Sequence, residues 1–248
     1  MSTSTPALHT DTTPTVVLVH GAFADSSSWN GVVEQLRRDG HPVIAAANPL
    51  RGLHSDAQYL RAVLDGVRGP VVLAGHSYGG TVMSAAADGH PQVRALVYVA
   101  GFSPEEGEST GELAAMFPGG ELGPALRAVP VPTAEGGTAT DLYVQQSRFR
   151  AVFAADVAQE LADLMAVTQR PIVADALEEK ATRTAWKTIP SWALVTTQDL
   201  AIPADSMRFM AERAGSRTVE VDASHAVPVS RPGVVARLID EAARATAR

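Results

Sequence analysis

The stretch that decides the fold runs from Pro70 to Gly80 and reads PVVLAGHSYGG. Its first half is a continuous apolar run, which is typical of a strand buried on both faces of a parallel sheet. Its second half is the pattern G-x-S-x-G, and the small residues 81–88 that follow predict a helix. A serine at a sharp strand-to-helix turn projects its hydroxyl above the sheet, so Ser77 is a candidate nucleophile. Without that context the pattern would indicate only a glycine-rich turn.

Similar apolar runs occur before and after this turn, and helical patterns separate them. The sequence predicts strands over residues 15–19, 42–46, 70–74, 95–100, 191–196 and 217–221, and helices over residues 29–39, 81–88 and 232–247, with a further helix capped by Ser55. Strands that alternate with helices indicate an α/β fold with a doubly wound, mostly parallel sheet.

The alternation stops near Ala100 and resumes near Pro190. The stretch between them is too long for a loop, and helical patterns cover residues 142–153 and 156–168. We therefore expect residues 104–186 to form an inserted helical lid over the carboxyl edge of the sheet. Residues 15–103 and 187–248 are expected to form the core. Residues 1–14, rich in Ser, Thr and Pro, are expected to be a disordered leader.

Composition excludes several classes of protein. The chain of 248 residues is 46% hydrophobic and 19% charged, with a net charge of -7, which disfavours disorder and a nucleic-acid partner. The absence of cysteine excludes disulfides, thiolate metal sites and a cysteine nucleophile. No apolar run approaches the roughly 18 residues of a membrane span, and the start lacks the features of a signal peptide. We expect a cytoplasmic protein without a membrane partner, and a homodimer is left open.

The loop after the first strand is a second candidate site. An oxyanion hole needs two backbone N–H groups aimed at one point, one from the residue after the nucleophile and one from an early strand-end loop. The first is Tyr78. The second is Ala22 in the stretch His20-Gly21-Ala22, with Phe23 as the second choice.

A base must follow the serine along the chain, and an acid must lie between the two. Of the seven histidines, only His225 follows the last predicted strand and precedes the last helix. Asp199 follows the strand 191–196, where its carboxylate could orient the His225 imidazole.

Four other carboxylates lie near predicted strand ends. Asp205 is expected to cap a helix that begins after Pro203, and Asp222 to form a turn. Glu105 and Glu106 follow the fourth strand, an alternative position for the acid. We prefer Asp199 because of its chain order and its place at a strand end.

With these residues in view, the chain resembles an α/β-hydrolase, and more narrowly the small plant methylesterase and hydroxynitrile lyase group with its bacterial relatives. The resemblance covers nearly the whole chain after Thr15 and is weak in the lid. It rests on residues 17–22 (VLVHGA), 28–29 (SW), 75–80 (GHSYGG), 198–199 (QD) and 224–225 (SH).

The resemblance implies a Ser77, His225 and Asp199 triad, an oxyanion hole of Ala22 and Tyr78, and hydrolysis of small carboxylic esters. It implies no metal and no organic cofactor. Similar plant lyases have a threonine in place of Gly21 and a lysine after the histidine, where this chain has Ala226. Branches that use an aspartate nucleophile are disfavoured by the serine at position 77.

Large side chains of the lid are candidates for an apolar substrate pocket, although each also fits a role in packing the lid onto the core. The pocket candidates are His20, Phe23, His76, Phe117, Phe149, Phe153, Met165 and Trp186. The pocket decides which bond is cleaved. As an alternative to ester hydrolysis, the same triad could act on a lactone, a thioester or a C–C bond. A third interpretation is a ligand-binding protein on this scaffold.

Overall fold

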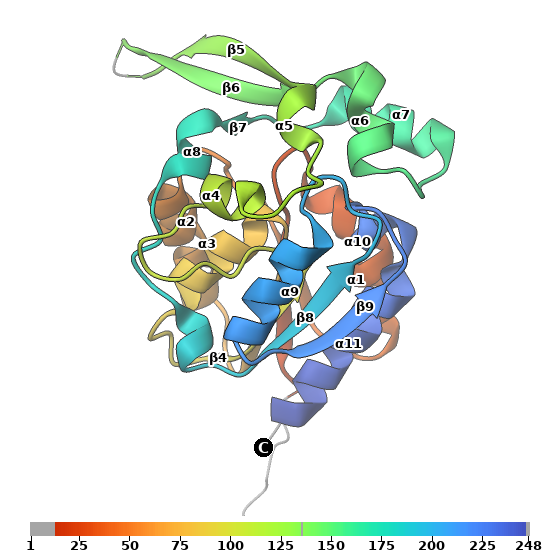
Figure 1. Ribbon diagram of the computed structural model, residues 1–248. Coiled ribbons are helices and arrows are strands. Elements are labelled where there is room, and N and C mark those ends of the chain that lie inside the picture. Colours follow the sequence, from red (N-terminus) through yellow and green to blue (C-terminus); the bar gives the residue numbers. More distant parts are fainter. Residues whose placement is uncertain (1–12, 135, 247–248) are drawn as a thin grey trace, which may run out of the picture.

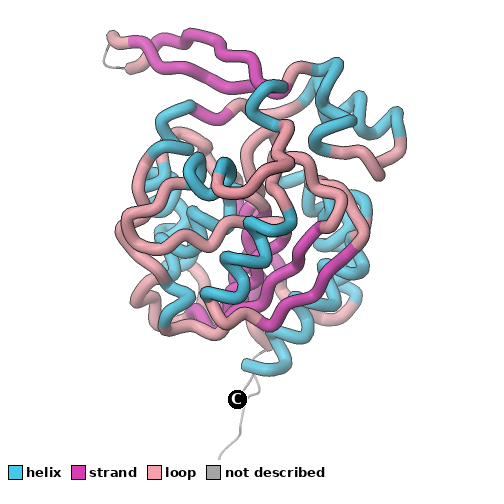
Figure 2. Tube along the Cα trace, viewed as in Figure 1, coloured by secondary structure: helices cyan, strands magenta, loops and turns pink. Residues whose placement is uncertain are grey.

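The structure is a computed structural model that describes residues 13–134 and 136–246. It contains a six-stranded sheet in the order β2-β1-β3-β4-β8-β9, in which all neighbours are parallel. Figures 1 and 2 show β8 and β9 of this sheet side by side, with helices around the sheet. The strands are β1 (Thr15–Val19), β2 (Val43–Ala46), β3 (Val71–His76), β4 (Val93–Val99), β8 (Ser191–Thr196) and β9 (Arg217–Val221). The expected doubly wound parallel sheet is confirmed. Residues 1–12 of the expected leader lie outside the described residues.

Helices cover both faces of the sheet because alternate side chains of each strand point to opposite faces. Val16 and Leu18 of β1 lie in one buried cluster with α1 and α11, whereas Val17 and Val19 lie in a second cluster with α2 and α3. The central strands therefore carry apolar residues on both faces. These helices are α1 (Asn30–Arg38), α2 (Leu53–Asp65), α3 (Tyr78–Ala87) and α11 (Pro232–Thr246).

The insertion between β4 and β8 is only partly helical. Its strands form a separate antiparallel sheet in the order β5-β6-β7, and the β5–β6 hairpin projects from the top of Figure 1. Its elements are α4 (Thr110–Ala115), α5 (Leu122–Ala125), β5 (Leu126–Pro132), β6 (Thr138–Val144), α6 (Gln146–Phe153), α7 (Gln159–Thr168), β7 (Ile172–Val173), α8 (Ala174–Glu178) and η2 (Ala185–Lys187). The boundaries 104 and 186 stay a prediction.

The expectation of a helix from Leu142 is therefore wrong at its start, because Leu142 lies in β6 opposite Ala128. The hairpin is formed by pairing between distant residues, which a local periodicity does not reveal. Its turn is closed by the Thr133 N–H, which donates to the Gly137 carbonyl at 3.0 Å, and Gly136 adopts a φ of 82° there. Pro130 and Pro132 lie in β5. Because proline is rare inside a sheet, these residues weaken the local sequence signal for this strand.

The remaining elements are η1 (Ser26–Trp29), α9 (Ala204–Arg213) and α10 (Val227–Ser230). Helix α9 follows β8 along the chain. Helix α10 follows β9 and directly precedes α11. Within the described ranges no helix has both the length and the hydrophobicity to cross a membrane.

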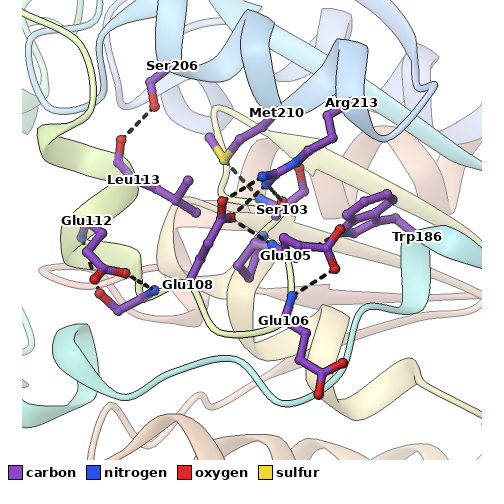
Figure 3. A network of polar contacts seen from close by, with 12 residues as sticks. Ser103, Glu105, Glu106, Glu108, Glu112, Leu113, Trp186, Ser206, Met210 and Arg213 are labelled. Carbon is purple, nitrogen blue, oxygen red and sulfur yellow. Dashed lines mark hydrogen bonds and ion pairs between the residues drawn. The ribbon is translucent and has the colours of Figure 1, made fainter.

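A polar network fastens the first segment of the insertion to α9 (Figure 3). Arg213 of α9 donates to both carboxylate oxygens of Glu108, at 2.6 and 2.8 Å, and to the Ser103 carbonyl at 3.1 Å. The guanidinium also lies over the ring of Trp186, whose indole N–H donates to the Pro104 carbonyl at 2.9 Å. A bidentate pair of this kind fixes geometry as well as charge.

We expect Glu108→Gln to lower the free energy of unfolding by about 1 kcal/mol at neutral pH, because it removes the charge of a partly buried bidentate pair. The hydrogen bonds from Arg213 lower the pKa of Glu108 below its ordinary value of 4.5. The contribution is therefore present above pH 4.5 and is lost as the pH falls through the lower folded-state pKa.

The measurement is urea unfolding of both proteins between pH 3 and pH 8. Glu106→Gln is the matched control, because Glu106 is an exposed neighbour on the same turn. A stability difference between wild type and Glu108→Gln that stays constant down to pH 3 would contradict this assignment.

Candidate active site

Ser77 occupies a strained turn between β3 and α3. Its φ of 53° and ψ of -127° are costly for a residue with a side chain. Hydrogen bonds hold the turn: the Ser77 N–H donates to the Ala100 carbonyl at 3.2 Å, and the Ser77 carbonyl accepts from the N–H groups of Gly80 at 2.9 Å and Phe102 at 3.2 Å. The surrounding chain thus fixes the serine at the carboxyl edge of the sheet, where it is 7% exposed.

Two glycines allow the backbone to pack directly around this turn. A Cβ atom on Gly79 would lie 2.4 Å from the Val19 carbonyl oxygen, and one on Gly21 would lie 2.6 Å from the Cβ of Ser77. Neither contact leaves room for a methyl group. The loop after β1 therefore lies against the serine turn, and residues 20–23 come alongside Ser77.

We expect Gly21→Ala to lower the rate of ester hydrolysis at least tenfold and to destabilise the fold by about 1–3 kcal/mol, because the new methyl group displaces Ser77 or the loop. The threonine that similar plant lyases carry at this position would need the same displacement. The rate and the melting temperature are measured together. Gly123→Ala is the control, since a Cβ on Gly123 would meet nothing within 4 Å. Equal rates for the two variants would contradict the expectation.

His225 and Asp199 form a buried pair. The Nδ1 atom of His225 lies 2.8 Å from Oδ2 of Asp199, and the two side chains are 1% and 0% exposed. The Asp199 carboxylate also accepts from the Thr196 hydroxyl at 2.8 Å, and from the N–H groups of Ala201 and Ile202, each at 2.8 Å. Donors approach both oxygens, so the carboxylate is held in one orientation and the imidazole is oriented with it.

The rival carboxylates have other partners. Asp205 lies in the first turn of α9, not at its N-cap, and pairs with Arg208 at 2.8 Å. Glu105 pairs with Lys187 at 2.6 Å, and the hydrogen bond from Lys187 lowers the pKa of this carboxyl. Asp222 accepts a long bond of 3.5 Å from the Thr197 hydroxyl, and Glu106 is exposed.

An aromatic shell surrounds the His225 ring. The rings of His76 and Phe153 lie 4.7 and 4.8 Å from it, centre to centre, and Phe153 in turn packs against Phe149 and Phe23. His76 Nε2 donates to the His225 carbonyl at 2.9 Å, and burial lowers the pKa of His76 well below its usual value. His76 is therefore a neutral support for the His225 loop. The buried Nε2 of His225 has no hydrogen-bond partner among the described residues.

The insertion also holds the His225 loop from the other side. The Ala226 N–H donates to the Phe153 carbonyl at 2.9 Å, and the Ser224 hydroxyl donates to Asp156. Residues on both sides of His225 are thus bound to the segment that joins α6 and α7.

The loop after β1 offers one free N–H group of the two expected candidates. The Phe23 N–H donates to the Arg170 carbonyl at 3.0 Å, so it is occupied. The N–H groups of Ala22 and Tyr78 have no acceptor among the described residues. Of the two alternatives, this geometry favours Ala22.

The other pocket candidates lie in three places. His20 is buried and held by the Gly21 carbonyl and the Asn48 N–H, at 2.9 and 3.0 Å, so it supports the loop after β1. Phe117 packs against Phe209 of α9, and Trp186 lies beside Arg213. Each of these two aromatic side chains thus has a contact with α9, and their part in a substrate pocket stays a prediction.

Met165 lines a cleft of about 380 Å³ between α7 and the loop after β1. Phe23 also lines this cleft, and its ring packs edge-on against Phe153, which in turn contacts the His225 ring. Leu161 and Leu164 are half exposed at its edge, at 42% and 56%. The cleft is mainly apolar on the side of α7.

Sequence reasoning missed Thr196 and Asp56. The hydroxyl of Thr196 contacts Asp199 from the last residue of β8, a position that no local pattern marks. Asp56 lies on the apolar face of α2 between Leu53 and Leu60, and it is fully buried. A carboxylate on an apolar helical stripe is a signal that could have identified it.

Comparisons with known proteins agree with this fold. Residues 16–238 match the family model described as "Alpha/beta hydrolase family". A carbendazim hydrolyzing esterase of Nocardioides sp. (strain SG-4G) is 34% identical over 106 residues, which are 38% of this chain and 44% of that relative. The alpha/beta hydrolase nvfD of Aspergillus novofumigatus (strain IBT 16806) is 25% identical over 254 residues, 93% of this chain and 96% of its own.

Solved structures match nearly the whole chain. The structure of polyneuridine aldehyde esterase covers 93% of this chain and 99% of its own, with a TM-score of 0.80 and 18% identity. A pyrethroid hydrolase from Sphingobium faniae JZ-2 covers 95% and 99%, with a TM-score of 0.76 and 24% identity. At these identities the likeness establishes the fold alone.

Proposed function

The chain belongs to the alpha/beta hydrolase family, and from that premise we propose that it is a serine hydrolase that cleaves carboxylic esters. The observation that carries the proposal is the buried His225–Asp199 pair, with its 2.8 Å contact, whose imidazole packs against His76, the residue before a serine held in a strained turn. A buried ionisable pair is costly to maintain for stability alone. The esterase name of the Nocardioides relative supports the same reaction.

In the proposed mechanism, Ser77 Oγ attacks the ester carbonyl while His225 Nε2 takes its proton. Asp199 accepts from Nδ1 and keeps the imidazole in the tautomer whose Nε2 lone pair is free. His225 then protonates the leaving alcohol. Water attacks the acyl-enzyme with His225 again as base, and Ser77 is regenerated. No step requires a metal ion or an organic cofactor.

The tetrahedral intermediate carries a negative oxygen that needs donors. We assign the Ala22 and Tyr78 N–H groups to it, because both lack other acceptors among the described residues. The Tyr78 N–H also belongs to the first turn of α3, where the helix dipole favours negative charge.

Small to medium apolar esters are the substrates that the surroundings favour. The shell around His225 is aromatic, and the neighbouring cleft is lined on the α7 side by Leu161, Leu164 and Met165. Burial of apolar substrate groups against such side chains contributes roughly 0.8 kcal/mol for each CH₂ group.

The cytoplasmic location remains a prediction from the sequence.

The test is hydrolysis of p-nitrophenyl esters from acetate to decanoate by the wild-type protein. We expect saturable turnover with an optimum at one acyl length, which reports the size of the pocket. Absence of turnover on every ester would exclude the proposed esterase. Turnover of lactones or thioesters would then indicate the same triad acting on another bond, and ligand binding without turnover would indicate a binding protein.

A further inference from the structure

The first turn of α3 carries the Tyr78 N–H, one of the proposed oxyanion donors, but no side-chain cap stabilises this turn. The N-cap residue, Ser77, makes no side-chain hydrogen bond to the turn. The first N–H groups of a helix have no partner within the helix, so an uncapped first turn depends on other contacts for its position.

Tyr78 is fixed through its side chain by α2. Its hydroxyl donates to Oδ2 of Asp56 at 3.0 Å, and both side chains are buried, with residue exposures of 1% and 0%. Burial raises the pKa of Tyr78 further above its ordinary value of 10, so the phenol keeps its proton and can donate it to Asp56. Burial also raises the pKa of Asp56 above its ordinary value. A buried carboxylate is destabilising unless its hydrogen bonds are satisfied, so its presence on the apolar face of α2 calls for a role.

Asp56 is itself held at its second oxygen. The backbone N–H of Arg51 donates to Oδ1 at 3.1 Å. The guanidinium of Arg51 contacts Asp141 of β6 at 2.6 Å and the Pro171 carbonyl at 3.0 Å. The support for Tyr78 therefore extends from α2 into the insertion.

We propose that Asp56 is a positioning residue for the reaction: by holding the Tyr78 hydroxyl, it fixes the first turn of α3 and aims the Tyr78 N–H at the oxyanion. This inference rests on the proposed function. Asp56 does not touch the substrate, and it acts only through the placement of Tyr78.

Tyr78→Phe is the direct test, because it removes one oxygen atom and keeps the ring and the backbone N–H. We expect kcat per titrated active site to fall about tenfold while KM changes less than about twofold, since the donor acts mainly in the transition state. The inhibition constant of a boronic acid that forms a tetrahedral adduct on Ser77 should rise by the same factor as kcat falls.

The matched control is Tyr98→Phe. Tyr98 is also buried, at 3%, and its hydroxyl forms one buried hydrogen bond of 2.6 Å, with Ser84. This variant loses a comparable contact in the same layer, so its melting temperature should fall while kcat per active site stays at the wild-type value. If both variants keep wild-type kcat, the contact is merely structural and the proposal is wrong.

Substitutions of Asp56 provide the second arm. In Asp56→Asn, the amide can donate to the phenol oxygen while its carbonyl still accepts from Arg51, so we expect kcat within about threefold of wild type. Asp56→Ala should match Tyr78→Phe. The double variant Asp56→Ala with Tyr78→Phe should be no slower than either single variant, because both remove one shared contact. Additive losses would overturn the proposal.

The rate at which diethyl p-nitrophenyl phosphate phosphorylates Ser77, with release of p-nitrophenolate, separates the two hypotheses. An unreactive wild-type protein would refute the proposed function. A reactive wild type whose rate is unchanged in Tyr78→Phe would refute only the role of Asp56.

Discussion

Replacement of Ser77 by alanine is expected to lower the turnover of p-nitrophenyl acetate by roughly 10⁴-fold or more. Alanine keeps the Cβ that packs against Gly21 and removes only the hydroxyl that attacks the ester. The turn itself is held by backbone hydrogen bonds to residues 80, 100 and 102, which the substitution does not touch. The far-ultraviolet circular dichroism and the melting temperature should therefore remain close to those of the wild type.

Ser84→Ala is the matched control, because Ser84 is a buried serine of α3 that bonds Tyr98 and has no part in the proposed chemistry. It should keep wild-type turnover. His225→Ala is expected to lose as much activity as Ser77→Ala, since nucleophile and base act as a unit. Retained activity in Ser77→Ala, with a normal fold, would mean that another residue is the nucleophile.

Asp199→Asn is expected to lower kcat by about 10²- to 10⁴-fold. The loop amides of Ala201 and Ile202 would orient the asparagine carbonyl as they now orient Oδ1. The amide N–H₂ would then face His225 Nδ1 and favour the tautomer with the proton on Nε2. An imidazole in that tautomer cannot take the proton from Ser77.

The measurement is kcat on a p-nitrophenyl ester as a function of pH, with Asp205→Asn as control. Asp205 is an exposed carboxylate on Arg208, so its substitution should leave kcat unchanged. A near-normal rate for Asp199→Asn would instead assign the acid to Asp222, Asp205 or Glu105.

The core of the fold was predictable because the central strands are apolar runs and helices such as α1 and α11 each have one apolar face. The strand Thr15–Val19 and the strand Ser191–Thr196 lie where the sequence places them. The insertion was less predictable. Its β5–β6 hairpin depends on pairing between residues such as Ala128 and Leu142, and its prolines weaken the local signal for a strand.

The positions of Ser77, Asp199 and His225 could be expected because each lies in the loop or turn after a strand, and the carboxyl ends of parallel strands meet at one edge. The contacts that hold these residues in place could not be expected from the sequence. The contact of Asp199 with Thr196 and that of Tyr78 with Asp56 join side chains whose proximity is set by packing between elements. Phe117 and Trp186 show the same limit, since their size marks them as pocket candidates but does not reveal their contacts with Phe209 and Arg213. Their place in a substrate pocket stays a prediction.

The close backbone approach at Gly21 and Gly79 has a consequence for how such chains diverge. A Cβ on Gly79 would meet the backbone of β1, so this glycine is required for the serine turn to pack, whatever the serine does. A descendant that had abandoned hydrolysis would still need it in order to fold. The buried His225–Asp199 pair has no comparable packing reason to persist, and apolar residues could replace it at little cost in stability. Among distant relatives, retention of that pair should therefore distinguish working enzymes from inactive ones more sharply than the glycine pattern does.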